Sequence, residues 1–112
     1  MPYLKVKTNL DIESKIDFMK RASKLLSTEL GKPEQYIMIS LEPKSDMLFA
    51  GSDLPTAYME LKSIGLPQNK TPRISEALCD FLQEELNIPS NRVYIEFANA
   101  DGRLWGWNKS TF

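Results

Sequence analysis

The chain has 112 residues, of which 42% are hydrophobic and 26% are charged. This length and composition are typical of one globular domain and argue against a disordered chain. The 14 basic and 15 acidic residues nearly balance, leaving a formal net charge of -1. Without a basic surplus, neither nucleic acid nor an anionic membrane is an expected partner.

The chain contains one cysteine, Cys79, and no histidine. A single cysteine permits no internal disulfide and fits a reducing compartment. A zinc site built from the usual ligands is not expected, and Ser-His and Cys-His catalysis are excluded for the isolated chain. Any proton transfer must therefore use carboxylates, lysine, tyrosine or the N-terminal amine.

The sequence also bears on location. No apolar stretch approaches the roughly 18 residues that a membrane span requires, so no membrane partner is expected. Residues 1–5 lack the apolar core of a signal peptide. The expected location is the cytoplasm, with secretion without a signal peptide as the alternative.

The first half of the chain predicts a strand, a helix and a second strand. Residues 3–8 and 36–42 read as strands, and residues 14–30 read as a helix. Ser14 is the predicted N-cap of the helix, and Gly31 is the predicted stop. The apolar side of this helix is expected to carry Ile16, Phe18, Met19, Ala22, Leu25, Leu26 and Leu30.

The second half predicts the same order of elements. Residues 57–63 and 93–98 alternate as strands, and between them Thr71 is the predicted N-cap of a helix. Pro72 would take the first helical position, and Asn87 would end the helix. The apolar stripe of this helix contains Ile74, Ala77, Leu78, Phe81, Leu82 and Leu86.

The two halves form an internal repeat within one domain, residues 1–112. Glu29–Pro33 and Glu85–Pro89 match in type at the helix exits, which divides the chain at about 1–56 and 57–112. The prediction is an α+β, two-layer fold. Two pseudo-symmetric βαβ units share a four-stranded sheet, with two helices on one face.

Two features extend this fold prediction. Residues 99–112 read as an appended short strand or hairpin, with Asp101 and Gly102 as a turn signal. Residues 36–42 carry apolar side chains on both faces of the predicted strand, with Tyr36 and Met38 on the second face. This pattern is typical of a strand buried on both faces. We therefore expect a second subunit to cover the open face. A partly exposed sheet is the alternative.

Pro2 and Lys32 are the first candidates for chemistry. Removal of Met1 would expose the Pro2 amine, and burial or a nearby cation would lower its pKa toward neutrality. A neutral amine is a competent general base. Lys32 follows the first predicted helix and could bind an anionic substrate. For each residue a purely structural role, such as stabilising the helix dipole, remains the alternative.

Aromatic residues are the next candidates. Trp105 and Trp107 would face the same side of a short strand, so with Phe112 they could wall a pocket or pack an interface. The Tyr94 hydroxyl could donate to a substrate oxygen or line a subunit contact.

These residues together resemble the macrophage migration inhibitory factor family of the tautomerase superfamily, essentially end to end. The matching segments are Met1-Pro2, Gly31-Lys32-Pro33, Gln35-Tyr36-Ile37, Gly51-Ser52, Ser63-Ile64-Gly65, Arg92-Val93-Tyr94-Ile95 and Gly106 to Phe112.

The resemblance implies a homotrimer with a site at each subunit interface. It also implies keto–enol tautomerisation of phenylpyruvate-like or D-dopachrome-type substrates, without a cofactor. Pro2 would be the base, while Lys32 and the backbone N–H of Ile64 would hold the substrate carboxylate. Tyr94 of a neighbouring subunit would contact the far end of the substrate. The apolar wall would consist of Trp105, Trp107 and Phe112.

The sequence departs from the family pattern at three places. Residues 56–59 lack the Cys-x-x-Cys motif of animal members, so no thiol–disulfide activity is expected. Glu96 replaces an asparagine at the pocket, and Trp105 replaces a smaller aliphatic residue. The alternative functions are a cytokine-like interaction module with a vestigial pocket and a ligand-sensing or RNA-binding βαβ module. The absence of an aromatic-rich basic strand motif disfavours RNA.

Overall fold

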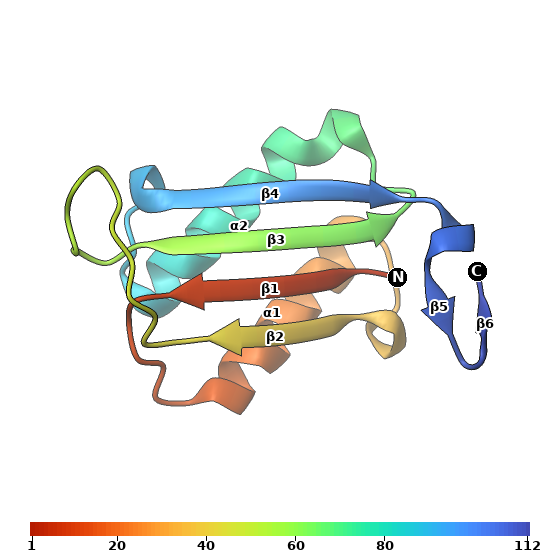
Figure 1. Cartoon of the computed structure of the whole chain (residues 1–112), viewed down its shortest axis with the longest axis horizontal. Coiled ribbons are helices and arrows are strands. Elements are labelled where there is room, and N and C mark those ends of the chain that lie inside the picture. The colour runs from red at the N-terminus through yellow and green to blue at the C-terminus, as the bar shows by residue number, and fades with distance from the viewer.

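The computed structural model describes all residues from 1 to 112. The elements, in chain order, are β1 (Tyr3–Thr8), α1 (Lys15–Leu30), β2 (Met38–Glu42), β3 (Ala57–Ile64), α2 (Thr71–Leu86), β4 (Val93–Ala100), β5 (Gly106–Trp107) and β6 (Ser110–Thr111). Within each half the two strands are parallel, and an antiparallel β1–β3 pair joins the halves. The four-stranded sheet has the order β2-β1-β3-β4. Both helices cover one face of it, which confirms the predicted α+β fold (Figure 1).

The core lies between the sheet and the two helices. Alternate residues of β1 and β3 are buried on the helix side, as the period of a strand requires. Each helix contributes three buried residues at helical spacing. These six residues are Phe18, Ala22, Leu26, Ile74, Leu78 and Leu82.

Ile16 is an exception to the predicted stripe. Its side chain is 62% exposed, because the buried line of α1 passes through Phe18, Ala22 and Leu26. The prediction that Ile16 faces the core was therefore wrong.

The C-terminal caps of both helices are as predicted, but the N-terminal caps differ from the prediction. Gly31 and Asn87 end the two helices in the left-handed conformation, with φ of 63° and 56°, as predicted. Ser14 precedes α1, but its side chain makes no capping hydrogen bond. Thr71 is already helical, and Lys70 is the N-cap of α2. The Thr71 hydroxyl donates instead to Gln68 O at 2.9 Å, within the short 3₁₀ turn that leads into the helix.

The second strand also starts later than predicted. Glu34–Tyr36 forms a 3₁₀ turn after Pro33, so β2 begins at Met38. Tyr36 therefore leaves the sheet.

The remaining face of the sheet is largely polar, not apolar. Tyr3 and Ser40 share a 2.7 Å hydrogen bond there, and Lys5 Nζ lies 3.0 Å from Glu42 Oε1. Met38, 66% exposed, is the apolar residue that β2 leaves on this face.

The C-terminal residues form a small hairpin beside the N-terminus, at one end of the sheet (Figure 1). Strands β5 and β6 pair antiparallel. Asn108 and Lys109 connect them with φ of 50° and 66°, as the two central residues of a type I′ turn require. The predicted hairpin is confirmed, but its turn lies here. Asp101 instead caps a preceding 3₁₀ turn by accepting from Arg103 N at 3.0 Å.

None of the helices combines the length and the apolar composition needed to cross a membrane.

The difference between Leu26 and Ile16 predicts a difference in stability. Leu26 is fully buried, so Leu26→Ala should lower the free energy of unfolding by about 2–5 kcal/mol through lost burial and a residual cavity. Ile16→Ala, on the same helix, should change it by about 0.5 kcal/mol or less. Urea unfolding followed by circular dichroism measures both. Equal losses for the two variants would contradict the described packing of α1.

Candidate functional site

A mostly apolar cavity of about 560 Å³ opens where β1 begins. It lies between the start of β1, the turn before β2 and the C-terminal hairpin. Its lining residues are Met1, Pro2, Tyr3, Gln35, Tyr36, Ile37, Met38, Ser40, Lys62, Trp105, Gly106, Trp107 and Phe112. Four of the predicted site residues thus meet here, although they come from the two ends of the chain.

The start of the chain is held in place at this cavity. Pro2 is buried, and its carbonyl oxygen accepts a hydrogen bond from Met38 N at 3.0 Å. Because Met1 precedes it, the Pro2 nitrogen is an amide in this chain and the free amine belongs to Met1. Burial lowers the pKa of that amine, and the positive charge of Lys32 lowers it further.

Lys32 is positioned by the end of α1. After the left-handed Gly31, Lys32 N donates to Ser27 O at 3.2 Å, and Ser27 Oγ donates to Lys32 O at 2.6 Å. The Lys32 ammonium donates to the carbonyl oxygen of Ile64 at 3.3 Å. Lys32 and Ile64 are therefore neighbours, and a cation lies at the C-terminal end of β3.

The aromatic side of the cavity is a connected group of rings. Trp107 and Phe112 stack with centroids 5.5 Å apart, and Tyr36 meets Trp107 edge-on at 5.7 Å. Trp105 is half-buried beside them. Tyr36 was missed as a site residue because it was assigned to a strand. The Gly31-Lys32-Pro33 turn signal just before it could have indicated a loop position.

Gly102 allows this hairpin to close. A Cβ at position 102 would lie 3.1 Å from the Phe112 carbonyl oxygen. Phe112 N donates to the carbonyl oxygens of Gly102 and Trp105 at 3.1 and 3.2 Å. The last residue is thereby returned to the cavity.

Four predicted site residues are not among those that line this cavity: Lys32, Ile64, Tyr94 and Glu96. Tyr94 lies toward the other end of β4, 65% exposed, with its ring 5.0 Å from that of Phe49. Glu96 lies in mid-strand and accepts a 2.8 Å hydrogen bond from the Tyr58 hydroxyl. That bond, helped by burial and by the charge of Glu96, raises the pKa of Tyr58 to about 12.

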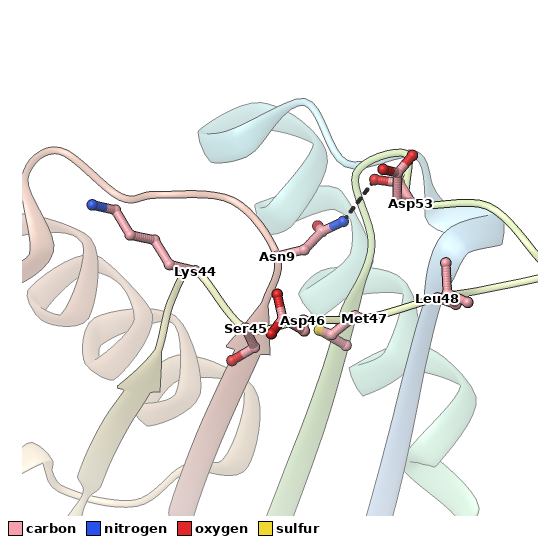
Figure 2. Close-up of a pocket in the computed structure, with 7 residues that line it drawn as sticks. All are labelled: Asn9, Lys44, Ser45, Asp46, Met47, Leu48 and Asp53. Atoms are coloured by element: carbon pink, nitrogen blue, oxygen red, sulfur yellow. Dashed lines mark hydrogen bonds between the residues drawn. The ribbon is translucent and has the colours of Figure 1, made fainter.

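A second cavity, of about 490 Å³, lies at the opposite end of the sheet. Its lining residues are Asn9, Lys44, Ser45, Asp46, Met47, Leu48 and Asp53, shown in Figure 2. Asn9 Nδ2 donates to Asp53 O at 3.0 Å, while the Lys44 side chain extends away from that pair (Figure 2). This cavity has no aromatic wall. No group of three or more His, Cys, Asp or Glu side chains in the chain is placed to hold a metal ion.

The first cavity is therefore the better candidate for a catalytic site. An amine with a lowered pKa can exchange protons near neutral pH. A neighbouring ammonium attracts an anion, and aromatic walls bind a flat apolar group.

The effect of Lys32 on the amine can be measured directly. In protein that keeps Met1, Lys32→Gln should raise the pKa of the N-terminal amine, because a neighbouring positive charge disfavours its protonated form. The rise should be partial, since burial remains. The pH dependence of amine acylation measures this pKa. Lys44→Gln, which removes the same charge at the opposite end of the sheet, is the matched control. An unchanged pKa in Lys32→Gln would contradict the described electrostatics.

Comparisons with known proteins agree with this geometry. The family model described as "Macrophage migration inhibitory factor (MIF)" matches residues 1–112. The chain is 43% identical to macrophage migration inhibitory factor of Xenopus tropicalis over 116 residues, covering 100% of this chain and 99% of that protein. It is 40% identical to the Brugia malayi homolog over 114 residues, with the same coverage.

Solved structures show the same fold. A homologue from Prochlorococcus marinus matches with a TM-score of 0.93 and 38% identity, over 98% of both chains. The Trichinella spiralis protein matches with a TM-score of 0.92 and 34% identity, over 98% of this chain and 99% of that chain. The chain belongs to the macrophage migration inhibitory factor family and has the fold of the tautomerase superfamily.

Proposed function

We propose that this protein is a keto–enol tautomerase of phenylpyruvate-like α-keto acids, with the Pro2 amine as general base once Met1 is removed. One observation carries the proposal. The N-terminal amine lies at an aromatic-walled cavity, and burial and Lys32 both lower its pKa. Removal of Met1 would transfer the amine to Pro2, which is buried and tied to β2.

The proposed reaction moves one proton. The neutral Pro2 amine takes a proton from the carbon next to the substrate carbonyl, and the C–H electron pair forms the carbon–carbon double bond of the enolate. The carbonyl electrons move to oxygen, which then receives that proton from the protonated Pro2 amine, so the base returns to its neutral form. Donors directed at that oxygen would stabilise its developing charge. Since one base near neutral pH transfers the proton in both directions, the proposal needs no cofactor.

Lys32 and Ile64 would bind the substrate carboxylate. The Lys32 ammonium now donates to the Ile64 carbonyl, and an incoming carboxylate would offer a charged acceptor, which makes a stronger hydrogen bond. The backbone N–H of Ile64 is the second proposed donor. Trp105, Trp107 and Phe112 would pack against the aromatic ring of the substrate.

The proposed active form is a homotrimer. Two helices cover one face of the sheet, and the other face remains open. Tyr94 is exposed far from the cavity of its own chain, so it would reach a site only as Tyr94 of the partner subunit. Glu96, also outside its own cavity, would face the substrate across the same contact.

A cytokine-like interaction module is the alternative function. The names of the relatives refer to inhibition of macrophage migration, and Glu96 and Trp105 alter the family's pocket. Negligible turnover of phenylpyruvate by protein that lacks Met1 would favour this alternative.

The base assignment predicts a large loss of activity in Pro2→Gly. A positioned general base contributes about 10²–10⁴-fold to rate, so kcat/KM for phenylpyruvate should fall by that order. An unchanged urea midpoint would show that the fold survives. Intact mass should accompany every assay, since protein that keeps Met1 has only an amide at Pro2 and should be equally inactive. High turnover in either sample would exclude Pro2 as the base.

The proposed trimer predicts a definite mass in solution. Sedimentation equilibrium should give three times the 12.8 kDa chain mass, because the proposed site takes Tyr94 from a neighbouring subunit. A monomer at the concentration of the activity assay would contradict the role given to Tyr94.

A further inference from the structure

Lys62 is a free cation at the edge of the proposed active site. It lies on the open face of β3, opposite Tyr3 of β1, and lines the same cavity as Pro2. None of the ion pairs in the chain involves it. Its neighbour on this face, Lys5, is in contrast paired with Glu42 at 3.0 Å. The Lys62 charge is therefore available to a ligand.

Within a single chain, the charges around the cavity have one sign. No Asp or Glu side chain lines it, and the Lys32 ammonium is held on the carbonyl of Ile64. Lys62 is a residue of β3, and the Lys32 ammonium contacts β3 at Ile64, two residues further along the strand. These two positions are roughly 7 Å apart along β3. Glu60 precedes Lys62 by two residues on the same face of β3 and lies toward the opposite end of the sheet. It forms no ion pair with Lys62.

We propose that Lys62 determines specificity by favouring substrates with a second anionic group beyond the carboxylate that Lys32 binds. This inference rests on the proposed function, because it takes the cavity as the substrate site. An aromatic acid with one carboxylate would satisfy Lys32 and leave Lys62 unpaired. A second carboxylate on the ring would pair with Lys62. The flexible four-carbon stem of lysine gives that ammonium a wide reach.

Lys62 is exposed, so its contribution should be modest and sensitive to salt. Exposed ion pairs are worth a factor of up to about fivefold in an equilibrium constant. Salt at about 1 M, where the Debye length is roughly 3 Å, should remove most of that factor.

Ligand binding tests the inference without requiring turnover. Trp105 and Trp107 are the chain's two tryptophans, and both line the cavity, so quenching of their fluorescence reports binding. The probes are phenylpropionate, with one carboxylate, and its para-carboxy derivative, with two. Neither has a ketone to enolise. In the protein without Met1, the derivative should bind up to about fivefold more tightly at low salt.

Three variants locate the effect. Lys62→Gln should abolish the preference for the dianion, and Lys62→Arg should keep it. Lys7→Gln removes the same charge from the same face of the sheet but outside the cavity, so it should keep the preference too.

Equal loss in Lys62→Gln and Lys7→Gln would overturn the inference, as would an unchanged preference in Lys62→Gln. Absence of any preference in the unaltered protein, or of any binding of the dianion, would also overturn it. These outcomes are separate from the Pro2→Gly assay. A chain that prefers the dianion through Lys62 but does not turn over phenylpyruvate would lose the proposed reaction and keep the ligand class.

Discussion

The placement of β1 in the middle of the sheet is the constraint on which the proposed site depends. β1 pairs with β2 on one side and with β3 on the other. The hydrogen bond from Met38 N to the Pro2 carbonyl continues this pairing to the second residue. Chain ends are usually poorly ordered unless they are tied into the fold. Here the backbone is hydrogen-bonded into the sheet as far as Pro2, so the N-terminal amine is held at a fixed point and is partly desolvated.

The repeat made most of the fold predictable from sequence. Both helix exits, Gly31 and Asn87, were visible because a left-handed cap selects these residue types. The errors came where packing of the helix on the sheet or a neighbouring turn overrides a local signal. Ile16 fits the spacing of the apolar stripe, yet the helix rotates so that Phe18 and Leu26 take the core. Tyr36 belongs to an apolar run, yet the turn after Pro33 removes it from the strand.

The site was less predictable than the fold because its parts are distant in the chain. The resemblance named Pro2 and the last aromatic residues, but not the contacts that bring them together. Periodicity could not show that Gly102 leaves space for Phe112, or that Lys62 and Tyr36 line the same cavity. Such contacts depend on how the hairpin folds back on the sheet. The type I′ turn at Asn108 determines that path, and it lies several residues after the turn signal read from the sequence.

Glu96 illustrates how the open sheet face could tune a site that its own chain does not contain. A carboxylate near the substrate would repel an acid and, at close range, raise the pKa of the base. In this chain the Tyr58 hydroxyl donates to Glu96, and the raised pKa of Tyr58 shows that the tyrosine stays protonated beside the carboxylate. A hydrogen bond of this kind satisfies the carboxylate without cancelling its charge. Lys62 at the cavity and Lys32 near the N-terminal amine, neither paired with a carboxylate, would then offset that charge where a substrate binds.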